Sequence, residues 1–340
     1  MEAAARVHRQ ASQLLIRTRR SLKKLILHVG LHKTGTSSIQ QAIVGREADL
    51  AAAGWAAPPF LGRKDSAHHI WVKRLREDAE KGIDGLVKAL EALPAEQLLF
   101  SSEALAHWLL VPEQAKALGK ALRRRFETRV VIYLRRQDFL KESVYAQIVK
   151  THFRGGIDNP GLYDLAFDRR LRTLDGAFGR RNVTPRIYRD DAPFDAVEDF
   201  RVLLGLPRTP ATSAASTRAN VSMPRRKVMF LGETVKKGRP HAEVLATVAQ
   251  VGQTQAIRDD GIRFLLSPQK RAKLVAKFAK GNEAICRRYG LDADAAYFTD
   301  ATPSAYPWLP PQPITDRERA DVTAEIEAAI AQLRQTARTA

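Results

Sequence analysis

The sequence LILHVGLHKTGTSSIQ, residues 25–40, carries most of the information about the architecture. Its apolar start, residues 25–29, predicts a short buried strand that ends at Gly30. A glycine-containing loop follows, and residues 39–44 have the pattern of a helix. A strand, a tight loop and a helix in this order place free backbone N–H groups and the positive end of a helix dipole together. That combination predicts a phosphate-binding loop.

The side chains of this loop suit an anion. Gly35 lets the backbone approach a ligand closely, and Lys33 adds a positive charge. We predict that the anion-binding residues are Lys33, Thr34, Gly35, Thr36, Ser37 and Ser38. The order differs from a Walker A loop, in which the lysine follows the second glycine and a Ser or Thr follows the lysine. A helix capped by serine or threonine would need only one such residue, so it explains the loop less well.

Short apolar runs later in the chain predict further strands at residues 98–101, 129–134 and 183–188. The last contains Pro185, which belongs at a sheet edge or a strand start. Helical patterns separate the strands, as is typical of a parallel sheet covered on both faces. We therefore expect an α/β fold with about five parallel strands, helices on both faces and a helical C-terminal part.

Three regions follow from the same patterns. Residues 1–24 form a basic arm, which is either a helix for an acidic membrane surface or a helix docked on its own domain. Residues 25–300 form the α/β domain, and helices are expected over about 225–250 and 268–289. Residues 301–340 form a Pro-rich connector and a last helix packed on the same domain. A capping box of Thr315 and Glu318 begins that helix.

Composition narrows the class of protein. The 340 residues are 44% hydrophobic, which excludes wholesale disorder, and the single cysteine, Cys286, excludes an internal disulfide framework. No apolar run approaches the ~18 residues of a membrane span, and residues 1–24 lack the core of a signal peptide. We expect a cytoplasmic protein, and peripheral contact of its basic arm with an acidic membrane surface stays open. The net charge of +19 favours phosphate-bearing or acidic partners, but it also fits a merely solvated basic surface.

The pattern Gly30-x-x-Lys33-Thr34-Gly35-Thr36-Ser37-Ser38 resembles the 5′-phosphosulfate loop of sulfotransferases that use 3′-phosphoadenosine 5′-phosphosulfate (PAPS). His32–Thr36 is similar to the start of this loop in bacterial glycan-type members. The resemblance covers roughly residues 25–290. It implies transfer of a sulfuryl group from PAPS to a hydroxyl or amine of a glycan, a glycolipid or a small acceptor. The product would be adenosine 3′,5′-bisphosphate (PAP), and no metal is expected.

The same resemblance implies a site for the 3′-phosphate. In the family this site is an arginine at the end of a later strand and a serine eight residues further on. Arg135 and Ser143 have this spacing here. A guanidinium suits a phosphate, although Arg135 could instead pair with Asp138. The resemblance also places Tyr188 near the adenine, and a tyrosine in the core at the sheet end is the alternative.

The base that removes the acceptor proton stays open between two residues. Glu103 follows a strand where cytosolic relatives carry a catalytic histidine, and a carboxylate can act as general base. Glu103 could equally serve only as a neighbour of a helix cap. The second candidate is His69 in the pair at residues 68–69, because histidine titrates near neutrality. Most histidines are structural, so His69 is the weaker of the two.

Two other classes of function remain compatible with the sequence. A P-loop nucleotide kinase or hydrolase would use the loop, but Lys33 precedes Gly35 and no clear magnesium-binding aspartate run follows. A non-enzymatic binder of polyanions would use the basic charge. No common DNA- or RNA-binding motif is present, so we expect no specific nucleic-acid partner. An inactive member that still binds PAPS is also compatible.

Overall fold

The computed structural model describes residues 22–58, 67–150, 156–159, 163–190, 194–208, 223–234, 240–300 and 308–339. Nearly all of the predicted basic arm lies outside these residues. Its expected end is wrong by two residues, because Lys23 and Lys24 already belong to the first strand.

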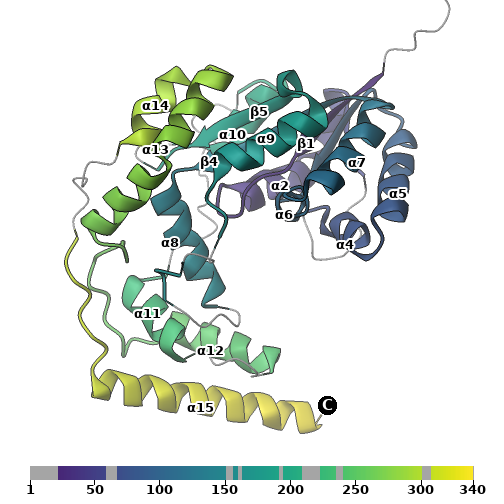
Figure 1. Ribbon diagram of the computed structural model, residues 1–340. Helices are drawn as coiled ribbons and strands as arrows, with labels where there is room; N and C mark the ends of the chain where they lie inside the picture. Colours follow the sequence, from purple (N-terminus) through teal and green to yellow (C-terminus); the bar gives the residue numbers. More distant parts are fainter. Residues whose placement is uncertain are drawn as a thin grey trace, which may run out of the picture.

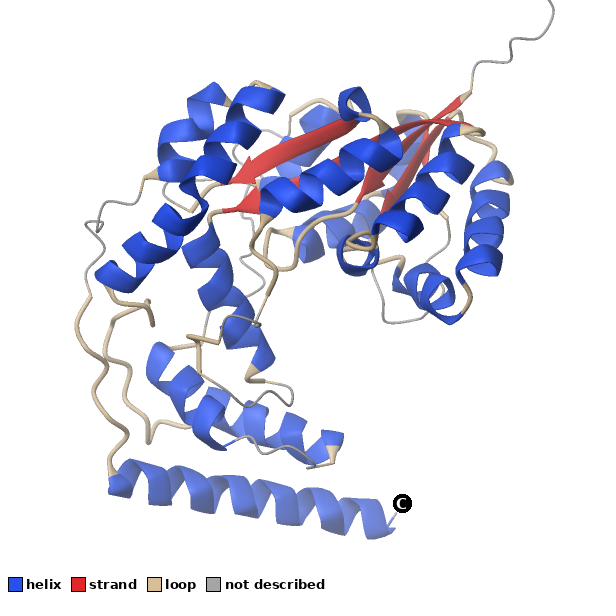
Figure 2. Ribbon diagram, in the orientation of Figure 1, coloured by secondary structure: helices blue, strands red, loops and turns tan. Residues whose placement is uncertain are grey.

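The predicted α/β architecture is confirmed: five parallel strands form one sheet (Figures 1 and 2). The strands are β1 (Lys23–His28), β2 (Trp55–Ala56), β3 (Gln97–Ser101), β4 (Phe126–Arg135) and β5 (Val183–Tyr188), in the order β2-β3-β1-β4-β5. The two-residue strand β2 was not singled out in the sequence. Pro185 lies in β5, at an edge of the sheet as predicted.

Alternating side chains of the strands enter two hydrophobic clusters. Leu25 and Leu27 of β1 face one cluster, and Ile26 faces the other. The first face is covered by α4 (His69–Glu77), α5 (Ala79–Glu91), α6 (Ala104–Trp108), α7 (Pro112–Arg123) and α9 (Phe167–Phe178). The second is covered by α2 (Thr36–Gly45), α3 (Glu47–Ala52) and α10 (Ala196–Leu203). Because both faces of the sheet are covered, the inner strands β1, β3 and β4 contain continuous apolar runs.

The helical part begins where the sheet ends. Helix α8 (Gln137–Ile148) leaves the end of β4 and runs toward the C-terminal helices (Figure 1). These are α11 (Arg225–Thr234), α12 (His241–Gln253), α13 (Pro268–Tyr289), α14 (Asp292–Thr299) and α15 (Asp316–Thr339). The single helix expected over about 225–250 is divided into α11 and α12. Pro240 precedes α12 and lacks the N–H that a continuous helix needs.

The capping box at the start of α15 is confirmed. The Thr315 amide donates to Glu318 at 2.9 Å, and the Glu318 amide donates to the Thr315 hydroxyl at 3.2 Å. Val322, Ile326 and Ile330 form the buried stripe of α15, which packs along α12. The expected loop over residues 207–225 lies largely outside the described residues.

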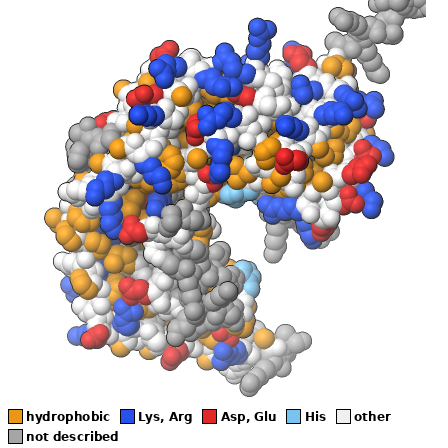
Figure 3. Space-filling model, in the orientation of Figure 1, with side chains coloured by type: hydrophobic (Ala, Val, Ile, Leu, Met, Phe, Trp, Pro, Cys, Tyr) orange, Lys and Arg blue, Asp and Glu red, His pale blue; other side chains and the backbone are white. Residues whose placement is uncertain are grey.

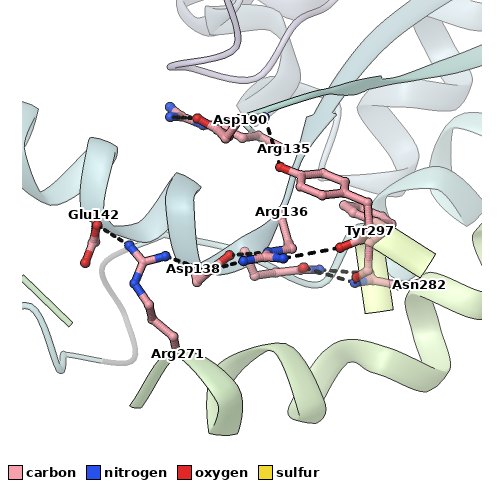
Figure 4. Close-up of polar contacts among 10 residues, drawn as sticks. Arg135, Arg136, Asp138, Glu142, Asp190, Arg271, Asn282 and Tyr297 are labelled. Carbon is pink, nitrogen blue, oxygen red and sulfur yellow. Dashed lines mark hydrogen bonds and ion pairs between the residues drawn. The ribbon is translucent and has the colours of Figure 1, made fainter. Parts of the chain in front are cut away.

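A buried polar cluster joins α8 to α13 and α14 (Figure 4). Arg136 and Arg271 both donate to Asp138, and Arg271 also donates to Glu142 at 2.6 Å. Asn282 of α13 and Gln137 of α8 donate to each other. Asp138, the alternative partner expected for Arg135, therefore pairs with Arg136 and Arg271.

The strand order reverses direction at a definite point of the sheet. Strand β1 lies between β3 and β4, and the chain passes from β1 first to one side of the sheet and later to the other. In open α/β sheets, ligands bind outside the carboxyl ends of strands at such a reversal. The loop after β1 and the end of β4 meet there.

Candidate functional site

The loop between β1 and α2 has an unusual backbone. Lys33 has a φ of 66°, and within the described residues it is the one non-glycine residue with positive φ. This left-handed conformation costs about 1–3 kcal/mol for a side chain other than glycine. Gly35 has a φ of 78°, and a Cβ there would lie 2.7 Å from the Cβ of Ala196. The predicted need for glycine at position 35 is therefore explained by both conformation and space.

The start of α2 is open to an anion. No side chain caps its first turn, and no acidic residue lies there, so its leading N–H groups lack side-chain partners. Ser37 is exposed and Ser38 is half-buried, whereas Thr36 is buried. Thr34 differs from the expectation. Its side chain is fully buried and its hydroxyl donates to the Leu31 carbonyl at 2.7 Å, so this hydroxyl shapes the turn.

Two lysines near the loop, Lys33 and Lys150, pair with no carboxylate of the described residues. Burial lowers the pKa of Lys33, and the charges of Lys150 and Arg135 lower it further. Burial also lowers the pKa of Lys150, which follows α8. Two half-buried lysines beside a helix start that has no side-chain cap have the charge and the free N–H groups that would suit an anion.

Arg135 lies at the end of β4 beside the loop, as expected, but its guanidinium is largely occupied (Figure 4). It donates to both carboxylate oxygens of Asp190, at 2.8 and 2.5 Å, and to the Lys33 carbonyl at 2.9 Å. These contacts use three of the five N–H donors of a guanidinium, so two remain. Ser143 lies two turns along α8 and is half-buried.

Tyr188, predicted to lie near an adenine, is brought to the same loop. Its ring lies 3.3 Å from the point where a Gly35 Cβ would be, and the Arg135 guanidinium lies 5.2 Å from the ring centroid. The ring also packs edge-on against Phe194, with centroids 5.3 Å apart. The tyrosine is therefore both part of the packing and adjacent to the anion site.

The two candidate bases contact each other. His69 Nε2 lies 3.4 Å from Glu103 Oε1, and Gln40 of α2 donates to Glu103 Oε2 at 2.7 Å. Burial raises the pKa of Glu103, but the hydrogen bonds from His69 and Gln40 outweigh burial and lower the pKa to about 2. His69 Nδ1 lies 2.9 Å from the Ser102 hydroxyl. The His69 side chain is 36% exposed and that of Glu103 is 12% exposed, so the histidine is the more accessible group.

Further histidines lie on the same side of the loop. The ring centroids of His32 and His107 are 5.3 Å apart, and the His107 ring lies 5.2 Å from Tyr163. Burial lowers the pKa of His107 to about 4, and the nearby His32 contributes to this. These rings are neutral at physiological pH. Figure 3 shows the molecule hollowed between its α/β part and its helical part, with histidine side chains at the inner edge.

The structure thus brings together all the predicted loop residues with Arg135 and Tyr188, and it joins Glu103 to His69. The prediction missed three contributors, namely Gln40, Lys150 and Asp190. Gln40 had a weak signal, since it is a polar residue one turn into the helix that follows the loop. Lys150 and Asp190 had none, because each reaches the site only through the tertiary fold.

Comparisons of the chain with family models, with curated proteins and with solved structures return no match. Within the described residues, no helix is long and apolar enough to cross a membrane. The same part of the chain contains no group of His, Cys, Asp or Glu side chains that could hold a metal ion. The geometry of the site is therefore the evidence for its chemistry.

Proposed function

We propose that the protein is a sulfotransferase that moves a sulfuryl group from PAPS to a hydroxyl or amine of a glycan, a glycolipid or a small acceptor. One observation carries the proposal. The start of α2 has no side-chain cap, Lys33 pairs with no carboxylate of the described residues, and Gln40 of the same helix donates to Glu103, the carboxylate that contacts the accessible His69. This transfer requires a site that binds the anionic leaving group and, beside it, a group that accepts a proton.

The transfer involves one bond at sulfur broken and one formed. The acceptor oxygen or nitrogen attacks the sulfur in line, and the bond from sulfur to the bridging oxygen of PAPS breaks. PAP leaves with the negative charge of that oxygen. Lys33 would neutralise this charge, while the α2 amides and the hydroxyls of Thr36, Ser37 and Ser38 would bind the 5′-phosphate.

The other groups follow from their places around the loop. The two free N–H donors of Arg135, with Ser143, would bind the 3′-phosphate, and Tyr188 would lie beside the adenine. We assign proton acceptance to His69 and orientation of its ring to Glu103. A carboxylate with a pKa of about 2 is a weak base near neutral pH, whereas a histidine is well matched.

The experiment that tests the proposal is calorimetric titration of the full chain with PAP, with ATP and adenosine 5′-phosphate (AMP) as controls. We expect micromolar or tighter binding of PAP and much weaker binding of ATP. Transfer of labelled sulfate from PAPS to a panel of saccharides and small hydroxylated acceptors then identifies the acceptor class. Equal affinity for PAP and ATP, or magnesium-dependent turnover of ATP, would overturn the proposal in favour of a kinase or hydrolase. Salt-dependent binding to polyanions with no response to PAP would favour a basic binding protein.

A further inference from the structure

The strained turn at Lys33 is held by one hydrogen bond from another strand. Lys33 has a φ of 66°, and its carbonyl accepts from Arg135 Nη1 at 2.9 Å. A strained backbone conformation persists only where the surrounding contacts hold it in place. Because Arg135 contacts the backbone of Lys33, it acts on the shape of the loop itself as well as on its charge.

Arg135 is in turn held by Asp190, the second residue after β5 (Figure 4). The carboxylate accepts from Nε at 2.8 Å and from Nη2 at 2.5 Å, and the two side chains are only 9% and 5% exposed. The backbone amide of Asp190 donates to the Tyr297 hydroxyl of α14 at 3.2 Å. A buried two-point contact of this kind fixes the plane of a guanidinium. Because Asp190 fixes this plane, it also fixes the direction of Nη1, the nitrogen that donates to the Lys33 carbonyl.

We propose that Asp190 is a positioning residue that presets the anion loop through Arg135. Tyr297, Asp190, Arg135 and the Lys33 carbonyl form a continuous chain of hydrogen bonds from the helical part to the loop. A loop fixed before the ligand arrives loses less conformational entropy on binding. The inference rests on the proposed function only in taking the ligand of this loop to be a 5′-phosphate.

A different role for Asp190 makes the opposite prediction. If the carboxylate merely competed with the 3′-phosphate for Arg135, its removal would free the arginine and tighten PAP. It would leave AMP, which has no 3′-phosphate, unaffected. If Asp190 presets the loop, its removal weakens AMP, which uses the loop alone, and weakens PAP at least as much, because PAP also uses Arg135. The affinity for AMP therefore separates the roles.

The test compares Asp190→Asn with the wild-type chain by titration with PAP and with AMP. We expect about a tenfold loss of affinity for AMP and at least that loss for PAP. Asp260→Asn is the matched control, because Asp260 also pairs with a buried arginine, Arg225, but in the helical part. That control should leave both affinities unchanged. Tighter PAP binding, or weaker binding of PAP alone, overturns the proposal.

A second readout needs no ligand. Hydrogen exchange of the peptide containing residues 29–38 should become faster in Asp190→Asn and stay unchanged in Asp260→Asn. If the wild-type chain binds neither PAP nor AMP while this exchange still rises, the proposed function fails and the positioning role stands. If the wild-type chain binds PAP and the variant alters neither exchange nor affinity, the positioning role fails alone. Tyr297→Phe leaves the ion pair intact and should give a smaller change of the same kind, so a fold defect in Asp190→Asn does not remove the test.

Discussion

Lys33 adopts a backbone conformation that lysine rarely takes, and it does so where its ammonium is needed. The φ of 66° at Lys33 places its side chain close to the first turn of α2. Glycine would adopt this conformation without strain, but it has no charge. The strain and the role that we propose for the ammonium are therefore located in the same residue.

Two substitutions of Lys33 separate the strain from the charge. Lys33→Ala and Lys33→Gly both remove the ammonium, so we expect each to lower turnover of PAPS by about 100-fold or more. Only glycine relieves the left-handed strain, so Lys33→Gly should be about 1 kcal/mol more stable than Lys33→Ala. Turnover assays and urea unfolding measure the two effects. Equal stability of the two variants would contradict the strain, and normal turnover would remove Lys33 from the mechanism.

The pH dependence of turnover distinguishes the two candidate bases. Glu103 stays ionised at every pH above about 4, since its pKa is about 2. If Glu103 took the proton, kcat would be flat between pH 5 and 8. If a histidine takes the proton, as we propose, kcat falls toward the acidic end of this range instead. His69→Gln should then lower kcat by about 100-fold, with PAP affinity unchanged. A flat profile would return the base role to Glu103.

Among single residues, the sequence predicts site residues that are neighbours in the chain and misses those that only the fold brings together. The loop from Lys33 to Ser38 is contiguous, so residue types and spacing were enough to identify it. Asp190 could not be found, because β5 must lie beside β4 before its carboxylate meets Arg135. The role of the Thr34 hydroxyl could not be deduced, because a loop hydroxyl can serve a ligand or, as its bond to the Leu31 carbonyl shows, the loop's own backbone.

Strands and helices were easiest to predict where both faces are buried. The strands β1, β3 and β4 contain apolar runs, because both faces of each are covered, whereas the edge strand β5 alternates buried and half-buried residues. Strand β2 contributes only Trp55 and Ala56, which is too short for any pattern. The capping box of α15 was readable because it is a local hydrogen-bond pattern.

Helices α7 and α9 pack with their backbones in close contact at Gly119. A Cβ at this position would overlap the carbonyl oxygen of Ala177, which is backbone and cannot rotate away. We expect Gly119→Ala to lower the free energy of unfolding by about 1–3 kcal/mol. In the fraction that folds, PAP affinity should be unchanged. Gly176→Ala on α9 is the control, since a Cβ there meets nothing within 4 Å. No difference between the two variants would contradict this account.

The ion cluster between α8 and α13 depends on Arg271. Burial raises the pKa of Glu142, and the charge of Arg271 opposes this shift. Arg271→Met leaves Asp138 and Glu142 in the interior without this partner, so we expect a loss of about 3–5 kcal/mol. Lys270→Met is the matched control, because Lys270 is 55% exposed and pairs with an exposed aspartate. That change should stay within about 1 kcal/mol. Similar losses in the two variants would contradict a special role for the cluster.

Across the whole molecule, buried neutral histidines link folding to pH. Burial lowers the pKa of His28 and of His68 to about 4, and His107 has a similar value. An unfolded histidine takes up its proton near pH 6.5, so the unfolded state binds more protons between about pH 6.5 and 4. Stability is therefore full above this window and is lost as the pH falls through it.

We expect the free energy of unfolding to fall by up to about 1.4 kcal/mol per pH unit for each of these histidines. Urea titrations at pH 7.0, 6.0 and 5.0 measure the slope. His28→Asn removes one titrating group and should reduce it, whereas His241→Gln changes an exposed histidine and should leave it unchanged. Stability that stays constant from pH 7 to 5 would contradict the neutral state of these side chains.

Helix α15 has a consequence for how the chain folds as it is made. It packs along α12 and buries its own stripe of Val322, Ile326 and Ile330. On the ribosome, α12 emerges long before α15, and synthesis at ~5–20 residues per second leaves an interval of several seconds between them. During that interval α12 lacks its contact with α15. Co-translational folding can therefore complete the sheet before the contact between α12 and α15 forms.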